Sequence, residues 1–456
     1  MTVRVRFAPS PTGYLHVGGA SSALANWMFA RQQGGEYLLR VEDTDTERNR
    51  PELTGNILDM LDWLGLQADG EPVYQSDRFD LYLAAAEKLT SAAQAYYCEC
   101  TAEEVQARNK AAGGKPGYDG FCRDRGLGPG PGRALRFRSA DDGATTFDDL
   151  IRGEISVENS NIEDFVLLRS NGTPTFLLAN IVDDADMAIT HVLRGEEHLN
   201  GTPKYLLLRD ALGLDYAPVF GHLPLLVNEQ RKKLSKRRDD VSVADYKARG
   251  FLPEAMRNYV ALLGWGPPDG VEVRPIEEMV ELFRVEDVNP SPAVFDIKKL
   301  TFVNGEWIRR IDVADFVDRA GGFVTGDDER AAIMALAPLA QERVKVLDEL
   351  PAYFDWVHGP AEDVKSWEKA MKIANAGEIL DAIIAEYDAS PWTRDELHAR
   401  FIALAERLGV SASKVQGPIR VAVTGRMVGL PLFELLEYLG REESLARLRT
   451  GRARLA

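Results

Sequence analysis

The feature that most constrains this chain is a glycine-bearing turn near its N-terminus. Residues 9–19 read PSPTGYLHVGG, with an alternating strand pattern at 3–8 before them and a helical pattern near 18–33 after them. In a strand–turn–helix unit, the backbone N–H groups of the turn and the positive end of the helix dipole favour a bound anion. Gly18 and Gly19 lack Cβ atoms, so a ligand can approach the backbone closely. The segment therefore predicts a nucleotide site.

Strands and helices continue to alternate after this turn, which predicts a Rossmann-type α/β fold with a parallel sheet. We expect a strand at 37–41 and helices at 52–64 and 77–97. Three cysteines and a Gly/Pro-rich passage between 98 and 138 indicate an inserted, loop-rich module. We expect the sheet pattern to resume at 175–182, 189–193 and 219–223, with a helix near 202–212. The ligand of such a sheet lies at the carboxyl ends of its strands.

Helical periods dominate the last third of the chain. Residues 240–310 mix helices and turns, and helical segments are expected at 327–337, 367–388, 394–408 and 432–439. We therefore divide the chain into five segments, 1–76, 77–174, 175–240, 241–310 and 311–456. The last of them is expected to be an all-helical domain.

Length and composition are those of a globular protein with several domains. The 456 residues hold only three cysteines, and they contain no apolar run of 18 residues. Without a signal region or a span, we expect a cytoplasmic protein with no membrane partner. The net charge of −17 argues against nucleic acid, but basic clusters at 231–238 and 444–454 keep such a partner open.

Two distant motifs have the chemistry for one triphosphate. A lone histidine such as His16 is most often a capping residue, but its glycine context favours a hydrogen bond to a phosphate. Lys233, Ser235 and Lys236 lie in the run KLSKR, which by default is a solvated basic face. If the strand-like residues 221–226 place this run beside the sheet, the ammonium groups of Lys233 and Lys236 can bind a triphosphate and stabilise the departing pyrophosphate.

Arg6 alternates with apolar residues in the first strand. It either faces water on an edge strand or points inward and offers two parallel N–H bonds to a ligand carboxylate. Glu42, at the end of the next strand, can orient a ligand ammonium. From the residues alone both interpretations stay open.

All three cysteines, Cys98, Cys100 and Cys122, cluster in the inserted module. They are either free buried thiols or ligands of a structural zinc ion, which prefers thiolates. Tyr118 and Asp124 compete for the fourth position.

The ordered motifs resemble the glutamyl-tRNA synthetases, a family of class I aminoacyl-tRNA synthetases, over nearly the whole chain. HVGG (16–19) and KLSKR (233–237) match the two class I motifs. Further matching stretches are RFAPSPTGYLHVGG (6–19), LLRVEDTDTER (38–48), YDGFCR (118–123), TTFDDLIRGEI (145–155), DFVLLRSNGTPT (164–175), VDDADMAITHVLRGEEHLNGTPK (182–204) and FLPEAMRNYVALLGW (251–265). The resemblance implies a catalytic Rossmann domain (1–76 and 175–240) interrupted by an acceptor-stem-binding module (77–174). A stem-contact domain (241–310) and a helical anticodon-binding domain (311–456) follow.

The resemblance also implies the reaction and its residues. L-Glutamate would be activated by ATP with Mg²⁺ to glutamyl-adenylate and then passed to the 3′ end of tRNA(Glu). One structural Zn²⁺ would be held in the inserted module. Nothing in the sequence suggests an obligate interface, so we expect a monomer. His16, Lys233 and Lys236 would be catalytic. ATP would be bound by Thr12, His16, Gly18, Gly19, Lys233, Ser235 and Lys236. Glutamate would be bound by Arg6, Ala8, Ser10, Glu42, Phe176, Asn180 and Arg194. Zinc would be bound by Cys98, Cys100, Cys122 and Tyr118.

Four positions depart from the family pattern: Phe176 replaces a common tyrosine, Ser21-Ser22 replace Arg-Thr, and Asp124 replaces a histidine. The alternatives are a non-discriminating enzyme that also charges tRNA(Gln), and a tRNA-binding paralogue without catalysis. A glutaminyl-tRNA synthetase would carry a β-barrel anticodon part, a shortened paralogue would lack residues 311–456, and an adenylyltransferase with no tRNA partner would leave the helical tail unexplained.

Overall fold

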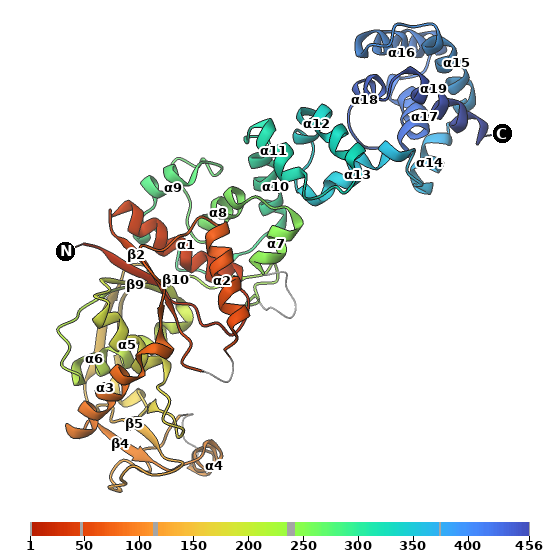
Figure 1. The fold of residues 1–456 in the computed structure, drawn as a ribbon. Coiled ribbons are helices and arrows are strands. Elements are labelled where there is room, and N and C mark those ends of the chain that lie inside the picture. Colours follow the sequence, from red (N-terminus) through yellow and green to blue (C-terminus); the bar gives the residue numbers. More distant parts are fainter. Residues whose placement is uncertain (1, 46–48, 113–116, 235–241, 374, 456) are drawn as a thin grey trace. The chain divides into compact units, whose positions relative to one another are not determined.

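The computed structural model describes residues 2–45, 49–112, 117–234, 242–373 and 375–455 (Figure 1). The chain forms two compact units. The first comprises Met1–Lys247 and Pro253–Leu300, and the second comprises Ala248–Leu252 and Thr301–Ala456. No helix in the described ranges combines the length and the apolar character needed to cross a lipid bilayer.

The first unit starts with the expected strand, turn and helix. Strand β1 (Arg4–Phe7) leads into helix α1 (Val17–Gln32), and Gly34, with φ of +59°, turns the chain into β2 (Glu36–Val41). β2 pairs in parallel with β1 and with the short β3 (Val73–Tyr74). Between β2 and β3 lies α2 (Pro51–Trp63), whose first residue is a proline, as suits a position without an intrahelical N–H bond.

The other half of the sheet lies beside β1. Strands β9 (His191–Gly195) and β10 (Val219–Leu223) are parallel, and the Thr190 N–H donates to the Arg4 carbonyl at 2.8 Å. β9 thus lies next to β1, although the strands of the two groups, β1–β3 and β6 (Ala144–Asp149), β7 (Gly153–Glu158), β9 and β10, pair only within their own group in the described residues. Beyond β10 lie β6 and β7. The strand order reverses between β1 and β9, which places a ligand crevice at their carboxyl ends.

Two sequence-based expectations about secondary structure in the first unit are wrong. Residues 175–182 do not continue the sheet but begin helix α5 (Phe176–Asp186). The expectation failed because the period of a short apolar run does not distinguish a buried helix from a buried strand. The helix expected at 77–97 ends early. A 3-10 turn (Gln75–Arg78) and α3 (Phe79–Ser91) are followed by strand β4 (Ala95–Cys98), which pairs with residues some forty positions away.

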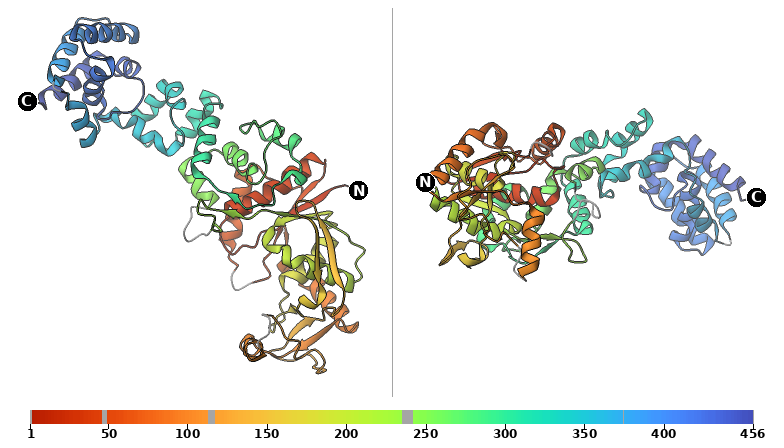
Figure 2. Two further views of the ribbon diagram at one scale, coloured as in Figure 1. Left: turned by 180° about the vertical axis from the view of Figure 1, so that it is seen from behind. Right: turned by 90° about the horizontal axis from the view of Figure 1, so that it is seen from below.

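The inserted module is built on an antiparallel sheet. β4, β5 (Ala134–Phe137) and β8 (Val166–Leu168) form it, and α4 (Ala102–Ala112) follows β4. β4, β5 and α4 lie at the end of the unit opposite to helices α8 (Pro253–Ala261) and α9 (Ile276–Leu282) (Figures 1 and 2). The remaining elements of the unit are 3-10 turns Asn159–Asn161, Glu196–Gly201 and Val285–Asp287, α6 (Thr202–Ala211), β11 (Leu226–Val227), α7 (Val243–Arg249), α8 (Pro253–Ala261), α9 (Ile276–Leu282), β12 (Ala293–Val294) and α10 (Ile297–Ile308). α7 and α10 extend into the residues of the second unit.

Every regular element in the described part of the second unit is a helix, which confirms the all-helical expectation. Helix α16 has start and stop signals that are visible in the sequence. The Thr393 hydroxyl caps its start by accepting a hydrogen bond from the Glu396 N–H, and Gly409 ends it in the left-handed region. The segment expected as one helix at 367–388 forms two. The elements are α11 (Val313–Ala320), α12 (Asp327–Gln341), a 3-10 turn (Leu347–Glu349), α13 (Leu350–Phe354), a 3-10 turn (Asp355–His358), α14 (Val364–Met371), α15 (Ala376–Asp388), α16 (Arg394–Leu408), α17 (Ala412–Thr424), α18 (Leu432–Leu439) and α19 (Arg441–Ala453).

Candidate active site

A cavity of about 450 Å³ lies in the crevice at the carboxyl ends of the parallel strands. It collects every nucleotide- and glutamate-binding residue predicted from the sequence that the structure describes. These are Arg6, Ala8, Ser10, Thr12, His16, Gly18, Gly19, Glu42, Phe176, Asn180, Arg194 and Lys233. Ser235 and Lys236 lie outside the described residues. Two stretches more than 200 residues apart, the turn with His16 and the run with Lys233, therefore share one cavity.

His16 caps the helix that it precedes. Its Nδ1 accepts a hydrogen bond from the Gly19 N–H at 3.0 Å. A Cβ at Gly18 would lie 3.1 Å from that nitrogen, so this position favours glycine beside the ring. Because Nδ1 accepts, the neutral imidazole carries its proton on Nε2. The capping role and a phosphate-binding role are thus compatible, since the ring also lines the cavity.

Lys233 reaches the cavity from a tight return of the chain after β11. Residues Val227 and Lys233 form an antiparallel bridge, and the Asn228 side chain accepts hydrogen bonds from the backbone N–H groups of Gln230 and Lys232. Lys233 is exposed, whereas Leu226 and Val227 are buried. The buried strand therefore anchors a basic segment at the rim of the cavity.

Arg6 is buried and points inward, so the edge-strand interpretation is wrong. Its forked pair of hydrogen bonds goes to a protein carboxylate: Nε and Nη2 donate to Asp184 at 2.9 and 3.2 Å. Burial opposes the charge of Arg6, but Asp184 outweighs it and raises the pKa of Arg6. The two parallel N–H bonds expected for a ligand are therefore made to Asp184, while the residue still lines the cavity.

Sequence reasoning missed the buried ionic network around Asp184. Arg40 is fully buried and donates to Asp184 at 2.5 Å and to Asn180 at 2.6 Å. Asp183, next to Asp184 in the sequence, accepts hydrogen bonds from the side chains of Gln75, Arg78 and Tyr82. The available signal was two adjacent acidic residues, 183–184, inside an otherwise apolar segment, because a carboxylate in such a segment is buried only where an opposite charge pairs with it.

The amino-acid end of the cavity is shaped by buried polar groups and one aromatic pair. Burial raises the pKa of Glu42, although Arg40 lies 3.5 Å away. Phe176 stacks on His198 with ring centroids 5.1 Å apart. Burial lowers the pKa of His198 to about 4, so this ring is neutral near pH 7. His198 also lines the cavity and was not singled out from the sequence.

Arg194 differs from Arg6 in the charge of its partners. Its Nη2 donates to the Thr202 hydroxyl at 2.8 Å, and its Nε donates to His222 Nε2 at 3.2 Å. Burial, together with the nearby charge of Arg6, lowers the pKa of Arg194 to about 10. Its hydrogen-bond partners within the described ranges are all neutral. An anionic ligand group can therefore pair with this guanidinium.

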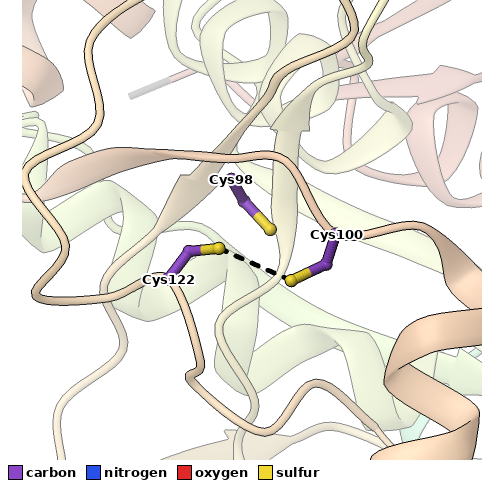
Figure 3. Close-up of side chains that lie close together, drawn as sticks. All are labelled: Cys98, Cys100 and Cys122. Atoms are coloured by element: carbon purple, nitrogen blue, oxygen red, sulfur yellow. Dashed lines mark hydrogen bonds between the residues drawn. The ribbon is translucent and has the colours of Figure 1, made fainter.

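The three cysteines form a second candidate site in the inserted module (Figure 3). Their sulfur atoms lie within 4.8 Å of one another and point toward a common centre. The Tyr118 hydroxyl oxygen lies 3.3 Å from Cys98 Sγ and accepts from the Cys122 N–H at 2.8 Å. The rival fourth ligand, Asp124, instead pairs with Arg138 at 2.8 Å. Burial opposes ionisation of Cys122, but hydrogen bonds from Glu99 N–H and Tyr118 outweigh it and lower the thiol pKa to about 7.

Comparison with known proteins decides the family. The model of the class I tRNA synthetase (E and Q) catalytic domain matches residues 2–302, and an anticodon binding domain model matches residues 312–452. A glutamate–tRNA ligase from Frankia casuarinae is 53% identical over 465 residues, covering 99% of this chain and 98% of that protein. The chain belongs to the glutamate–tRNA ligases. It is therefore an enzyme of the class I aminoacyl-tRNA synthetases.

Further relatives agree with this membership. The glutamate–tRNA ligase from Salinispora arenicola is 53% identical, with 100% of both chains covered. Among solved structures, a glutamate–tRNA ligase from Elizabethkingia meningosepticum in complex with its amino acid superposes with a TM-score of 0.87 at 30% identity, covering 100% of both chains. The family resemblance and the fold class expected from the sequence are confirmed. The shortened-paralogue alternative is wrong, because the family's anticodon domain is present.

Proposed function

We propose that this synthetase activates L-glutamate with ATP and transfers the glutamyl group to the 3′ end of tRNA(Glu). The observation that carries the proposal is the cavity that joins His16, Lys233 and Arg194 in a chain that matches glutamate–tRNA ligases over its full length. In the first step, the α-carboxylate of glutamate attacks the α-phosphate of Mg²⁺-bound ATP and releases pyrophosphate. In the second step, a ribose hydroxyl of the terminal adenosine takes the glutamyl group.

The charges in the cavity match the charges of the amino acid. Glutamate carries two carboxylates and one ammonium group, and the cavity offers Arg6, Arg194 and Glu42. Arg194 is the stronger candidate for a carboxylate because its hydrogen-bond partners are neutral, whereas Asp184 already compensates Arg6. A neutral glutamine side chain cannot make the charged pair, which favours glutamate. Ala8, Ser10, Phe176 and Asn180 complete this end of the cavity.

The nucleotide end follows from the turn and the basic run. We assign Thr12, His16, Gly18, Gly19 and Lys233 to ATP, together with Ser235 and Lys236 of the same basic run. Positive groups at fixed positions stabilise the negative charge that develops on the departing pyrophosphate without further reorganisation. Mg²⁺ enters with the ATP. His16, Lys233 and Lys236 are the proposed catalytic residues.

We extend the proposal to the other parts of the chain. Residues 1–76 and 175–240 form the catalytic domain, 77–174 bind the acceptor stem, 241–310 contact the stem, and 311–456 bind the anticodon. We further propose a cytoplasmic monomer. Aminoacylation of separately transcribed tRNAs tests whether tRNA(Gln) is charged as well.

We also propose that Cys98, Cys100, Cys122 and Tyr118 hold a structural Zn²⁺. Three thiols around a common centre, with the Tyr118 hydroxyl 3.3 Å from one of the sulfur atoms, fit a four-coordinate ion that prefers sulfur. Elemental analysis of the purified protein tests the assignment: about one zinc per chain is expected, and protein without zinc would refute it.

Pyrophosphate exchange tests the central proposal. We expect exchange with L-glutamate in the presence of tRNA(Glu), and its collapse in Lys236→Ala. Lys232→Ala is the matched control, because Lys232 belongs to the same basic run but does not line the cavity. Separately transcribed tRNAs for glutamate, glutamine and aspartate show which of them are charged. No exchange with any of the three would favour the catalysis-free tRNA-binding paralogue.

A further inference from the structure

Three buried side chains, Asp149, His222 and Arg194, form a hydrogen-bonded line behind the cavity. Of these three, only Arg194 was predicted as a site residue from the sequence. Asp149 ends β6, His222 lies on β10 and Arg194 lies on β9. His222 is completely buried, and the other two are at most 8% exposed. Asp149 Oδ2 lies 2.6 Å from His222 Nδ1, and Arg194 Nε lies 3.2 Å from His222 Nε2.

The hydrogen-bond chemistry at both ends of the ring assigns one tautomer. Asp149 Oδ1 accepts backbone N–H bonds from Ile151, Arg152 and His222 at 3.0, 3.0 and 3.2 Å, as expected of an ionised carboxylate. Burial by itself would raise the pKa of Asp149, but the interactions with His222 and the backbone N–H bonds together outweigh it and lower this pKa. A carboxylate only accepts and a guanidinium only donates. Nδ1 of His222 must therefore carry the proton, and Nε2 must accept from Arg194. The Thr202 hydroxyl also lies 3.1 Å from Nε2 and, with this tautomer, can act only as a donor to it.

A neutral ring between the two charges has a specific consequence. If Asp149 contacted Arg194 directly, it would compensate the guanidinium charge, as Asp184 does for Arg6 at 2.9 Å. The intervening imidazole orients Arg194 and leaves its charge for a ligand. Burial lowers the pKa of His222, which keeps the ring neutral.

We propose that Asp149 and His222 are positioning residues: Asp149 holds His222 as the Nδ1–H tautomer, and Nε2 of that ring fixes the Arg194 guanidinium for a carboxylate of the amino-acid substrate. This inference rests on the proposed function, because the contact between Arg194 and glutamate is part of it. Neither positioning residue lines the cavity, so they act only through Arg194.

Asp149→Asn is the most specific test. Asparagine has the shape of aspartate, and the substitution replaces the acceptor that faces His222 Nδ1 by a donor. The amide oxygen can keep the three backbone N–H bonds, and the amide NH₂ then faces Nδ1 and forces the proton to Nε2. Two donors, His222 Nε2–H and Arg194 Nε–H, would then oppose each other. We expect the KM for glutamate in pyrophosphate exchange to rise about tenfold or more, the usual effect of losing a hydrogen bond to a charged group. The KM for ATP should change less than about twofold.

Nitrogen-15 NMR of histidine-labelled protein gives a readout independent of activity. The chain has six histidines, and His222→Phe assigns the signal of interest. We expect the Nδ1–H tautomer in the wild-type protein and the Nε2–H tautomer in Asp149→Asn. His222→Phe should raise the KM for glutamate in the same way, and if Asp149→Asn does not fold, this variant and the wild-type spectrum still decide.

Asp69→Asn is the matched control: Asp69 also accepts hydrogen bonds from a backbone N–H and an arginine side chain, but those partners, Tyr37 and Arg31, do not line the cavity. It should leave both KM values unchanged. An Nε2–H tautomer in the wild-type protein would overturn the proposal, as would equal rises in both KM values or a flipped tautomer with an unchanged glutamate KM. If the wild-type protein used no glutamate, the proposed function would fail, while the wild-type spectrum would still decide the tautomer.

Discussion

The substitution Asp184→Asn probes the buried network that supports Arg6 and Arg40. Asp184 is fully buried and receives four hydrogen bonds. Arg6 Nε and Arg40 Nη1 donate to Oδ1 at 2.9 and 2.5 Å, and Arg6 Nη2 and Tyr205 OH donate to Oδ2 at 3.2 and 3.0 Å. An asparagine places an NH₂ group against one of these two pairs of donors, whichever way the amide turns.

The expected cost follows from these contacts. At least two hydrogen bonds are lost, and two buried guanidiniums lose a neutralising charge. Breaking a buried ion pair by removing one partner costs about 3–5 kcal/mol. Asp186→Asn is the control on the same helix, because Asp186 is exposed and pairs with Arg78 at the surface. An exposed pair contributes about 1 kcal/mol or less.

Hydrogen exchange followed by mass spectrometry measures this effect locally, on peptides from β1 and α5, without assuming that both units unfold together. The pH dependence adds a second check. Burial alone would raise the pKa of Asp184, but Arg40 and Arg6 outweigh it and hold the pKa well below its usual range. The stabilisation is therefore fully present above the unfolded-state pKa of about 4 and is lost as the pH falls below it.

The free energy of local opening, measured by hydrogen exchange, should therefore differ between the wild-type protein and Asp184→Asn by a constant amount from about pH 5 to 8. This difference should become smaller below about pH 4. A loss in Asp184→Asn no larger than that in Asp186→Asn would refute the reasoning. So would a gap that widens as the pH falls.

Three further predictions concern the two candidate sites. Arg6→Gln should raise the KM for glutamate much more than the KM for ATP, and equal changes would mean that Arg6 acts only structurally; Arg4→Gln, on the same strand but half-exposed, is the control. Lys233→Ala should raise the KM for ATP in pyrophosphate exchange while Lys232→Ala does not, and equal effects would contradict the assignment. Tyr118→Phe should weaken zinc retention against a chromophoric chelator, and unchanged retention would exclude the hydroxyl as a ligand.

Local patterns were sufficient for much of this protein. The strand, turn and helix over 3–33 follow from a glycine-bearing turn and its flanking periods, and α16 and α18 have the bounds expected from the sequence. The fold class and family could also be inferred, because ordered motifs such as HVGG and KLSKR are themselves sequence. Each of these inferences depends on residues that are close together along the chain.

The sequence by itself determined where the chain turns, which faces are apolar and which residues carry the chemistry. Only the tertiary structure decided what those residues contact. Arg6 binds Asp184, 178 positions away, and residues 95–98 form a strand because β5 lies beside them. A buried charge or a strand edge gains its stability from partners brought close by folding, and their identity is not encoded in the local pattern.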